Sequence, residues 1–325
     1  MVPLILRGTR YMNRRHFIKK TALGGAALAG LSSCSVTMNE VTRAERAVLE
    51  GDGFTFVHLT DQHVRDKRKG DDGYRACIRH IKNLRTPPRF AIMGGDGPFD
   101  GCYTPKDEFA RQIDLFKEIN GELGVPWHNC IGNHDVLGLS PRRKVPIDDP
   151  DMGRKFIMDR LGQERDYYSF DHGGWHFAIL NCIHEIEADH GPDYEARIGE
   201  EQLDWLANDL GQANKPSMVV THIAAISAAN VIAGNAGADT INSGVMVLDT
   251  KDLRHVMERH KVKAVLQGHR HMAEDYRYND IWYLSGDAVS ACWWGGTWNG
   301  RPYGYTVLHC LPDGQFTWQR KTFAW

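Results

Sequence analysis

The chain has 325 residues, of which 42% are hydrophobic and 25% charged, and its formal net charge at pH 7 is −2. This apolar share is typical of a folded globular protein, and a nearly neutral chain without a basic stripe argues against binding a nucleic-acid polymer. The length accommodates a single α/β domain or two smaller domains.

The first part of the chain is basic and then apolar. Arg14 and Arg15 precede an apolar stretch over residues 22–31, which leads to Ser32-Ser33-Cys34. That stretch is shorter than the ~20 residues that span a membrane. The pattern resembles a bacterial twin-arginine export signal followed by a lipobox, whose cysteine is lipidated. A basic, alanine-rich tail is the alternative.

From this pattern we predict three segments: an export signal over 1–34, a linker over 35–52 and a folded domain over 53–325. The protein would be exported to the periplasm or cell envelope and held at the membrane by a lipid on Cys34.

Five short apolar runs follow along the chain, and each leads to polar residues that can bind a metal. Short apolar runs closed by glycine or polar residues predict buried strands. The runs cover residues 54–59, 90–93, 127–131, 217–220 and 264–266. The polar segments after them, called stations here, are Asp61-Gln62-His63, Gly95-Asp96, Gly132-Asn133-His134-Asp135, Thr221-His222 and Gly268-His269-Arg270-His271. Because sites in open α/β sheets collect beyond the carboxyl ends of strands, we expect the stations to share one crevice.

Helices and a hairpin are predicted between the stations. Apolar residues at helical spacing predict helices over 72–84, 200–210 and 253–260. Thr104-Pro105-Lys106-Asp107 has the form of a capped helix start. Residues 167–180, with a turn over 171–174, predict a hairpin.

The residue types in the stations indicate a metal site. Carboxylate, carboxamide and imidazole groups bind divalent metals, and there are enough of them for two ions. Two ions about 4 Å apart favour in-line displacement at phosphorus. Taken singly, the residues have simpler explanations, because a lone histidine is commonly a core or surface residue and an aspartate or asparagine can cap a helix or form a turn. Those explanations do not account for all five stations in one order.

That order, D-x-H … G-D … G-N-H-D … H … G-H-x-H, resembles the signature of the calcineurin-like metallophosphoesterases over about residues 54–313. The resemblance implies an α/β fold, a four-layer α/β/β/α sandwich of two mixed sheets. It also implies two divalent or mixed-valence transition metal ions, which would be iron, manganese or zinc. One ion would be held by Asp61, His63, Asp96 and His271, and the other by Asp96, Asn133, His222 and His269.

The resemblance further implies an enzyme that hydrolyses a small phosphate ester. A hydroxide bridging the metals would attack phosphorus in line, while His134, oriented by Asp135, would protonate or stabilise the leaving oxygen. The stations match those of bacterial cyclic-nucleotide and glycerophosphodiester phosphodiesterases, which favours a phosphodiesterase.

Two alternatives remain open. A phosphomonoesterase of the purple acid type is one, although His63 stands where that subgroup lacks a histidine and Phe99 stands where it has a metal-bound tyrosine. A non-catalytic scaffold with this fold is the other, and the completeness of the stations argues against it.

Several further residues are candidates for substrate contact. Residues 224–244 form a long segment beside His222, and long loops at active sites are commonly lids. Trp293 and Trp294 follow the last station and can either stack on a base or sugar or pack at a sheet edge. His184 and His190, which follow another predicted strand, are the remaining candidates.

Overall fold

The computed structural model describes residues 45–233 and 244–325, and these belong to one compact unit, Asn39–Trp325. The predicted export signal, with Cys34, lies outside the described residues. Among the residues that are described, none of the helices combines the length and the apolar character needed to cross a membrane.

A five-stranded sheet carries the first three stations. Its order is β13-β12-β1-β2-β3, and the neighbouring strands β1, β2 and β3 run parallel. The strands are β1 (Phe54–Leu59), β2 (Ala91–Met93), β3 (Trp127–Asn129), β12 (Gly304–Cys310) and β13 (Phe316–Thr322). Strands β12 and β13 are antiparallel, so the sheet is mixed.

A six-stranded sheet carries the other two stations. Its order is β10-β11-β9-β8-β5-β4, with β5, β8, β9 and β11 parallel and an antiparallel strand at each edge. The strands are β4 (Tyr168–His172), β5 (Trp175–Ile179), β8 (Ser217–Val220), β9 (Val262–Gln267), β10 (Glu274–Tyr278) and β11 (Ile281–Ser285). A separate hairpin joins β6 (Ile183–Ala188) to β7 (Gly191–Ala196).

The two sheets pack face to face through an aromatic core. The ring of Phe56 stacks on Phe90 at a centroid distance of 4.9 Å and meets Phe177 of the other sheet edge-on at 5.4 Å. All three side chains are buried. Burying one such side chain stabilises the fold by about 1.5–3 kcal/mol, so this core sets how the two sheets sit together.

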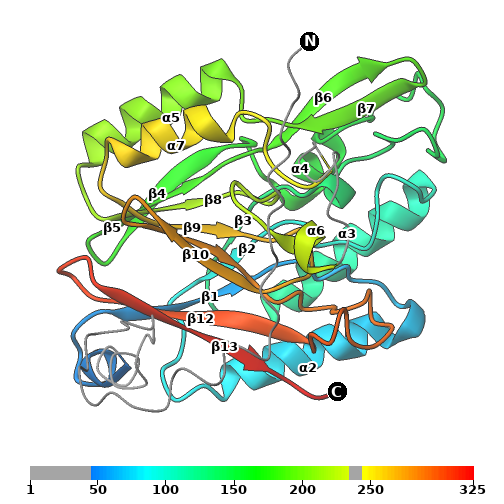
Figure 1. Ribbon diagram of the computed structural model, residues 1–325. Helices are drawn as coiled ribbons and strands as arrows, with labels where there is room; N and C mark the ends of the chain where they lie inside the picture. Colours follow the sequence, from blue (N-terminus) through cyan, green and yellow to red (C-terminus); the bar gives the residue numbers. More distant parts are fainter. Residues whose placement is uncertain (1–44, 234–243) are drawn as a thin grey trace, which may run out of the picture. The chain divides into compact units, whose positions relative to one another are not determined.

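Helices cover the outer face of each sheet, which gives four layers (Figure 1). Helices α2 (Gly70–Lys82) and α3 (Lys106–Gly121) pack on the five-stranded sheet, while α5 (Glu200–Ala213) and α7 (Thr250–Glu258) pack on the six-stranded one. The shorter helices are η2 (Lys67–Lys69), η3 (Asn133–Asp135), α4 (Lys155–Leu161) and α6 (Ala229–Ile232). The predicted four-layer α/β/β/α sandwich of two mixed sheets is confirmed.

The predicted helices and hairpin between the stations are present, with one local difference. Thr104 does not cap α3, because Pro105 occupies the N-cap position and the Thr104 hydroxyl donates to the carbonyl of Asp100. The Thr104 hydroxyl therefore stabilises the loop that contains Asp100, and α3 begins at Lys106, one residue later than predicted.

Candidate metal centre

The strand registers bring the stations to one edge of the paired sheets. In the five-stranded sheet Leu59 pairs with Met93, so Asp61 and Asp96 leave their strands side by side. In the six-stranded sheet Val220 pairs with Leu266, and the amide of Gly268 donates to the carbonyl of His222 at 2.9 Å. The two sheets meet there, because His222 Nδ1 lies 2.8 Å from the carbonyl oxygen of Gly94. The structure thus brings the stations together, as the sequence predicts.

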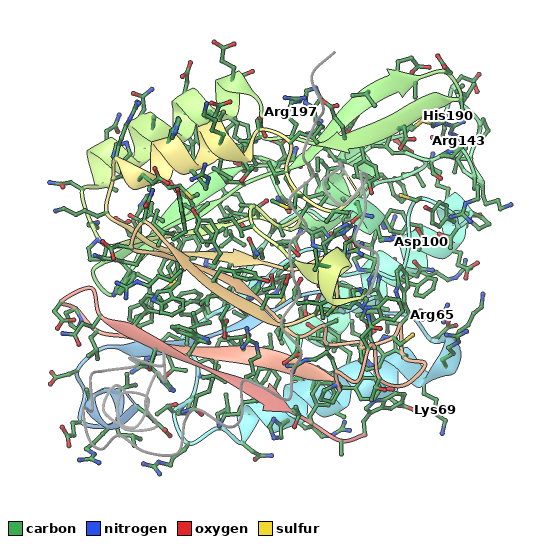
Figure 2. The ribbon with its side chains drawn as sticks, in the orientation of Figure 1. Arg65, Lys69, Asp100, Arg143, His190 and Arg197 are labelled. Carbon is green, nitrogen blue, oxygen red and sulfur yellow. The ribbon has the colours of Figure 1, made fainter. Side chains whose placement is uncertain are left out.

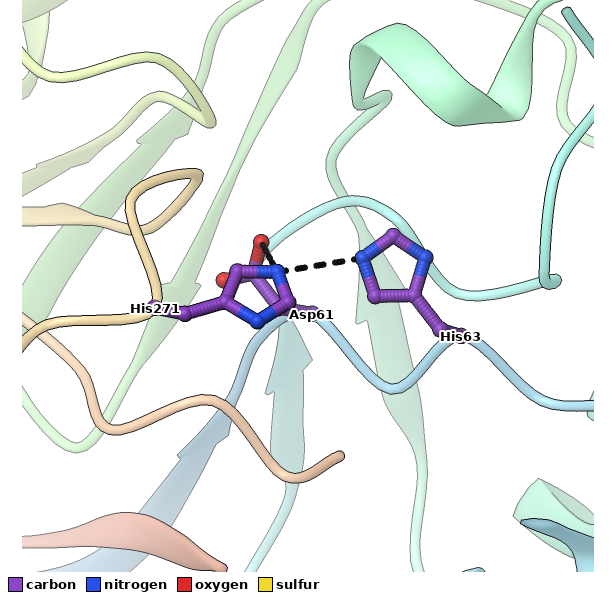
Figure 3. A group of neighbouring side chains, drawn as sticks. All are labelled: Asp61, His63 and His271. Atoms are coloured by element: carbon purple, nitrogen blue, oxygen red, sulfur yellow. Dashed lines mark hydrogen bonds and ion pairs between the residues drawn. The ribbon is translucent and has the colours of Figure 1, made fainter. Parts of the chain in front are cut away.

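Asp61, His63 and His271 form the first group of possible ligands (Figure 3). His271 Nε2 lies 3.3 Å from Asp61 Oδ1 and 3.2 Å from His63 Nε2. All three side chains are buried. Figure 3 shows the two imidazoles turned toward each other beside the carboxylate, so their lone pairs and the carboxylate oxygen converge on one point.

Asp96, His222 and His269 form the second group. His222 Nε2 lies 3.1 Å from Asp96 Oδ2 and 3.2 Å from the side-chain oxygen of Asn133. The same Asp96 oxygen is 3.7 Å from His63 Nε2 in the first group. One carboxylate thus faces both groups, which is the arrangement that a bridging ligand requires.

Backbone carbonyls hold the imidazoles so that one ring nitrogen stays free. The Nδ1 atoms of His63, His222 and His271 lie 2.9, 2.8 and 2.5 Å from the carbonyl oxygens of Phe99, Gly94 and Ala291. A ring N–H donated to a carbonyl leaves Nε2 as the lone pair that faces the site. His269 is reversed, because its Nε2 lies 3.0 Å from the Gly244 carbonyl oxygen, which leaves Nδ1 for the site.

The electrostatics of the site suit a cation. Burial lowers the pKa of His63 to about 3 and that of His269 to about 4, so both imidazoles are in the neutral form that binds metals. Burial also disfavours a charged His222, but the Asp96 carboxylate overcomes this and raises its pKa to about 10. The pKa of Asp96 is in turn held well below its usual value, against burial, chiefly by His222. The buried Asp96 carboxylate thus attracts a cation, which without a metal is the protonated His222, and a divalent ion would take the place of that proton. The donor set and its charge therefore fit divalent metal ions.

Five of the proposed ligands have a left-handed backbone, which local sequence patterns do not predict. Their φ angles are 56° for Asp61, 43° for His63, 55° for Asp96, 73° for His269 and 53° for His271. Such residues are uncommon outside glycine and cost about 1 kcal/mol or more each. The surrounding fold must hold these turns in place, and each turn aims a side chain into the site.

Glycines beside the ligands allow the backbone to approach the site closely. A Cβ on Gly132 would lie 2.2 Å from Asp96 Oδ1, and one on Gly268 would lie 2.0 Å from Thr60 Oγ1 and 2.8 Å from Asp61 Oδ2. Any side chain at either position would therefore displace a carboxylate of the site.

Asp135 does not orient His134 as the sequence analysis expected. Its carboxylate accepts the backbone N–H groups of Asp96 at 2.9 Å, Gly97 at 2.9 Å and Gly132 at 2.7 Å. The group is fully buried, and burial together with Asp96 raises its pKa to about 7. Asp135 therefore ties the second and third stations together, because buried amides need an acceptor.

Asp100, which the sequence analysis missed, is the carboxylate that contacts His134. Its Oδ1 lies 3.2 Å from His134 Nδ1 and also accepts the N–H groups of Cys102 at 2.9 Å and Tyr103 at 3.2 Å. Burial lowers the pKa of His134, but Asp96 and Asp100 outweigh that effect and raise it. In the sequence, the only sign of this role was that Asp100 lies a few residues after the Gly95-Asp96 station.

Asp100, Cys102 and His134 form a third cluster of ligand-type atoms. The Cys102 thiol donates to the carbonyl of Asn133, with sulfur and oxygen 3.0 Å apart, and burial raises its pKa well above the usual value. A thiol that stays protonated is a poor ligand. This cluster is therefore a hydrogen-bonding network that positions His134.

The two neighbouring tryptophans have different roles. Trp293 stacks on the His63 ring at 3.6 Å with an interplanar angle of 19°, and meets His134 edge-on at 4.7 Å. Trp294 is 4% exposed, and its indole N–H donates to the backbone carbonyls of Gln62 and His63. Trp293 thus lies at the site, whereas Trp294 packs beneath the first station, where stacking on a substrate is impossible.

The histidines of the β6–β7 hairpin have no contact with the stations in the part of the chain that is described. His184 is exposed on β6, and His190 Nε2 pairs with Asp193 at 2.6 Å beside Arg143, near the end of the hairpin (Figure 2). Arg143 donates to the carbonyls of His190 and Pro192, so it anchors the hairpin. The proposed substrate contacts of both histidines thus have no structural support here.

The segment predicted as a lid is described only over 224–233 and at Gly244. Arg270, between the last two histidines, donates to Asn230 Oδ1 at 2.6 Å, and Gly244 contacts His269. Both described ends of the segment are thus tied to the last station, and the rest lies outside the described residues.

Imidazoles, carboxylates and a carboxamide that converge from the ends of parallel strands, beside a histidine able to transfer a proton, define a metal-dependent hydrolase. The family model described as Calcineurin-like phosphoesterase matches residues 54–273, and the chain belongs to this family. It is a metal-dependent phosphoric ester hydrolase.

Relatives with curated names are similar over most of the chain. A probable cyclic nucleotide phosphodiesterase of Xenorhabdus bovienii is 24% identical over 274 residues, which are 80% of this chain and 97% of that protein. A probable glycerophosphodiester phosphodiesterase of Arcobacter nitrofigilis is 24% identical over 250 residues, 72% of this chain and 78% of that protein.

Solved structures share the fold. A dimetal phosphatase from Danio rerio has a TM-score of 0.59 at 14% identity, over 84% of this chain and 100% of that one. A purple acid phosphatase from yellow lupin has a TM-score of 0.56 at 14% identity, over 83% of this chain and 51% of that one. At such identities the likeness concerns the fold alone.

Proposed function

We propose that the protein is a phosphodiesterase that works with two divalent transition metal ions. Asp61, His63, Asp96 and His271 would hold one ion, and Asp96, Asn133, His222 and His269 the other. When bound, such ions activate water and neutralise the phosphate oxygens. The side chains of the two ligand groups converge, and Asp96 faces both groups, which supports this assignment.

His134 would act as the general acid for the leaving oxygen. Because its Nδ1 faces Asp100, Nε2 is the nitrogen available to the substrate. The raised pKa of His134 keeps more of it protonated near neutral pH, as an acid requires. Its backbone N–H donates to Asp96 Oδ1 at 2.8 Å, so its position is linked to that of the proposed bridging ligand.

The residue type at position 99 carries the preference for diesters over the monoesters that purple acid phosphatases cleave. The phenyl ring of Phe99, which has no ligand atom, stands where the purple acid subgroup has its metal-bound tyrosine, and the carbonyl of Phe99 instead accepts from His63 Nδ1. The names of the two curated relatives support the same preference.

The test is a comparison of kcat/KM on bis(p-nitrophenyl) phosphate and on p-nitrophenyl phosphate, with iron, manganese and zinc reconstituted one at a time. We expect the diester to be preferred with the metal that gives the highest activity. A preference for the monoester at every pH and with every metal would overturn the proposal in favour of a phosphomonoesterase.

A further inference from the structure

Arg65, two residues after the first station, is a half-buried cation whose guanidinium forms no ion pair with a carboxylate among the described residues, although Glu108, Asp66 and Asp100 lie in its surroundings. Its Cζ lies 3.6 Å from the centre of the Phe99 ring, and its Nε is buried without a hydrogen-bond acceptor. Other arginines pair differently: Arg75 contacts Glu118, and Arg320 contacts Asp275. Stacking on an aromatic ring, rather than an ion pair, therefore orients Arg65.

An aromatic wall connects Arg65 to the metal centre. The Phe99 ring meets Trp293 edge-on at 5.2 Å, and Trp293 stacks on His63. Arg65 thus lies one phenyl ring away from a proposed metal ligand. Figure 2 shows it on the same side of the domain as Asp100, the residue that positions His134.

The charges around Arg65 are mixed. Arg68 is the neighbouring cation and Glu108, Asp66 and Asp100 are the neighbouring carboxylates, but none of these carboxylates forms an ion pair with Arg65 in the described part of the chain. A guanidinium that is stacked but not paired keeps its hydrogen-bond donors for an anion. Guanidinium groups bind carboxylates and phosphates through two parallel hydrogen bonds, and a stacked guanidinium loses little freedom in doing so.

We propose that Arg65 binds a second, non-scissile anionic group of the substrate, a carboxylate or a phosphate carried by one of its organic substituents. The preferred substrate is then a phosphodiester with an additional negative charge, rather than one charged only at the scissile phosphate. This inference rests on the proposed phosphodiesterase function. If Arg65 only covers Phe99 with its aliphatic stem, no such preference exists.

The test uses three diesters that release the same p-nitrophenolate and differ in the second aryl group. That group is 4-carbamoylphenyl, 4-carboxyphenyl or 4-phosphonophenyl, so shape is nearly constant while charge changes. We expect the wild-type protein to have a kcat/KM about 10-fold higher on an anionic diester than on the carboxamide, a difference of about 1.4 kcal/mol. The carboxylate and phosphonate arms show which anion is preferred, and added salt should reduce the preference.

Arg65→Gln should bring the ratio of kcat/KM on the anionic diester to kcat/KM on the neutral diester close to 1. Arg65→Lys should restore part of the preference. Arg277→Gln removes an exposed arginine of β10 that is paired with Asp280, and this matched control should keep the wild-type ratio of kcat/KM values. Metal content and melting temperature of each variant show whether it is folded and loaded.

The proposed subsite would be wrong if the wild-type protein had similar kcat/KM values on anionic and neutral diesters. It would also be wrong if Arg65→Gln kept the wild-type preference for the anionic diester. In the latter case Arg142, stacked on Tyr103 next to His134, would be the next candidate. If the metal-loaded protein hydrolysed none of the three diesters but cleaved p-nitrophenyl phosphate, the proposed phosphodiesterase function itself would be wrong.

Discussion

His134 Nδ1 lies 3.2 Å from Asp100 Oδ1, whereas the carboxylate of Asp135, the next residue along the chain, faces backbone amides. Together with Asp96, a carboxylate from the loop after β2 therefore raises the pKa of the proposed acid. Asp135 holds that loop against the third station, so the two aspartates support His134 in different ways.

The first prediction concerns Asp100→Asn. The variant keeps an acceptor for the amides of Cys102 and Tyr103 but loses one of the two charges, those of Asp96 and Asp100, that raise the pKa of His134. A general acid is active when protonated, so activity is lost as pH rises through its pKa. The basic limb of the pH–rate profile should move to lower pH, with kcat down about 10-fold or more. If the basic limb of the pH–rate profile did not move in the variant, Asp100 would have no influence on the proton transfer.

The second prediction concerns Asp96→Ala. Because Asp96 Oδ2 faces both His63 and His222, its loss should remove both metal ions and abolish turnover. Elemental analysis of the purified variant measures this directly. Two metal ions per chain in the variant would contradict the bridging position of Asp96.

The third prediction is that His134→Ala keeps its metals and loses chemistry. The histidine side chain pairs with Asp100 and meets the rings of His63 and Trp293 edge-on, but it belongs to neither proposed ligand set, so metal content should match that of the wild type. The chemical step should slow by about 100-fold, and more on esters with poor leaving groups, which depend most on an acid. If His134→Ala and the wild-type protein hydrolysed esters with poor leaving groups at equal rates, His134 would have no part in the mechanism.

The fourth prediction separates the two tryptophans. Trp294→Ala should lower the free energy of unfolding by about 3–5 kcal/mol, because a buried indole is lost. Trp293→Ala should change stability less and raise KM for nucleotide diesters more than for bis(p-nitrophenyl) phosphate, since a purine base has a larger stacking surface than a nitrophenyl ring. Chemical denaturation and steady-state kinetics check both. Equal effects on the two substrates would make Trp293 a packing residue.

The fifth prediction concerns export, which we propose from the sequence pattern of residues 1–34 alone. Cys34→Ser should shift the protein from the membrane fraction to a soluble or uncleaved form, because the lipid would be its anchor. Fractionation of cells that express each form measures this. A wild-type protein found only in the cytoplasm, with Arg14 and Arg15 intact, would contradict the proposal.

Several parts of the fold were not predictable from local patterns. The β6–β7 hairpin alternates polar and apolar residues only weakly and contacts neither sheet through strand pairing, so its strands do not have the signal of a buried strand. Strand β12 pairs antiparallel with β1 across more than 240 residues of sequence, Phe54 with Cys310 for example, and no local pattern encodes such a partner.

The sequence by itself determined which residues are available for the metal centre and in which order they leave their strands. Apolar runs that end at glycine and polar residues are local features, and Asp61, Asp96 and His222 could be recognised from them. Only the tertiary structure decided which carboxylate holds His134, and that Trp293 rather than Trp294 faces the site. The physical reason is that left-handed turns, such as those with φ of 53° at Trp293 and 64° at Trp294, redirect adjacent side chains. Contacts made across the whole fold hold these turns, and residue type alone does not specify them.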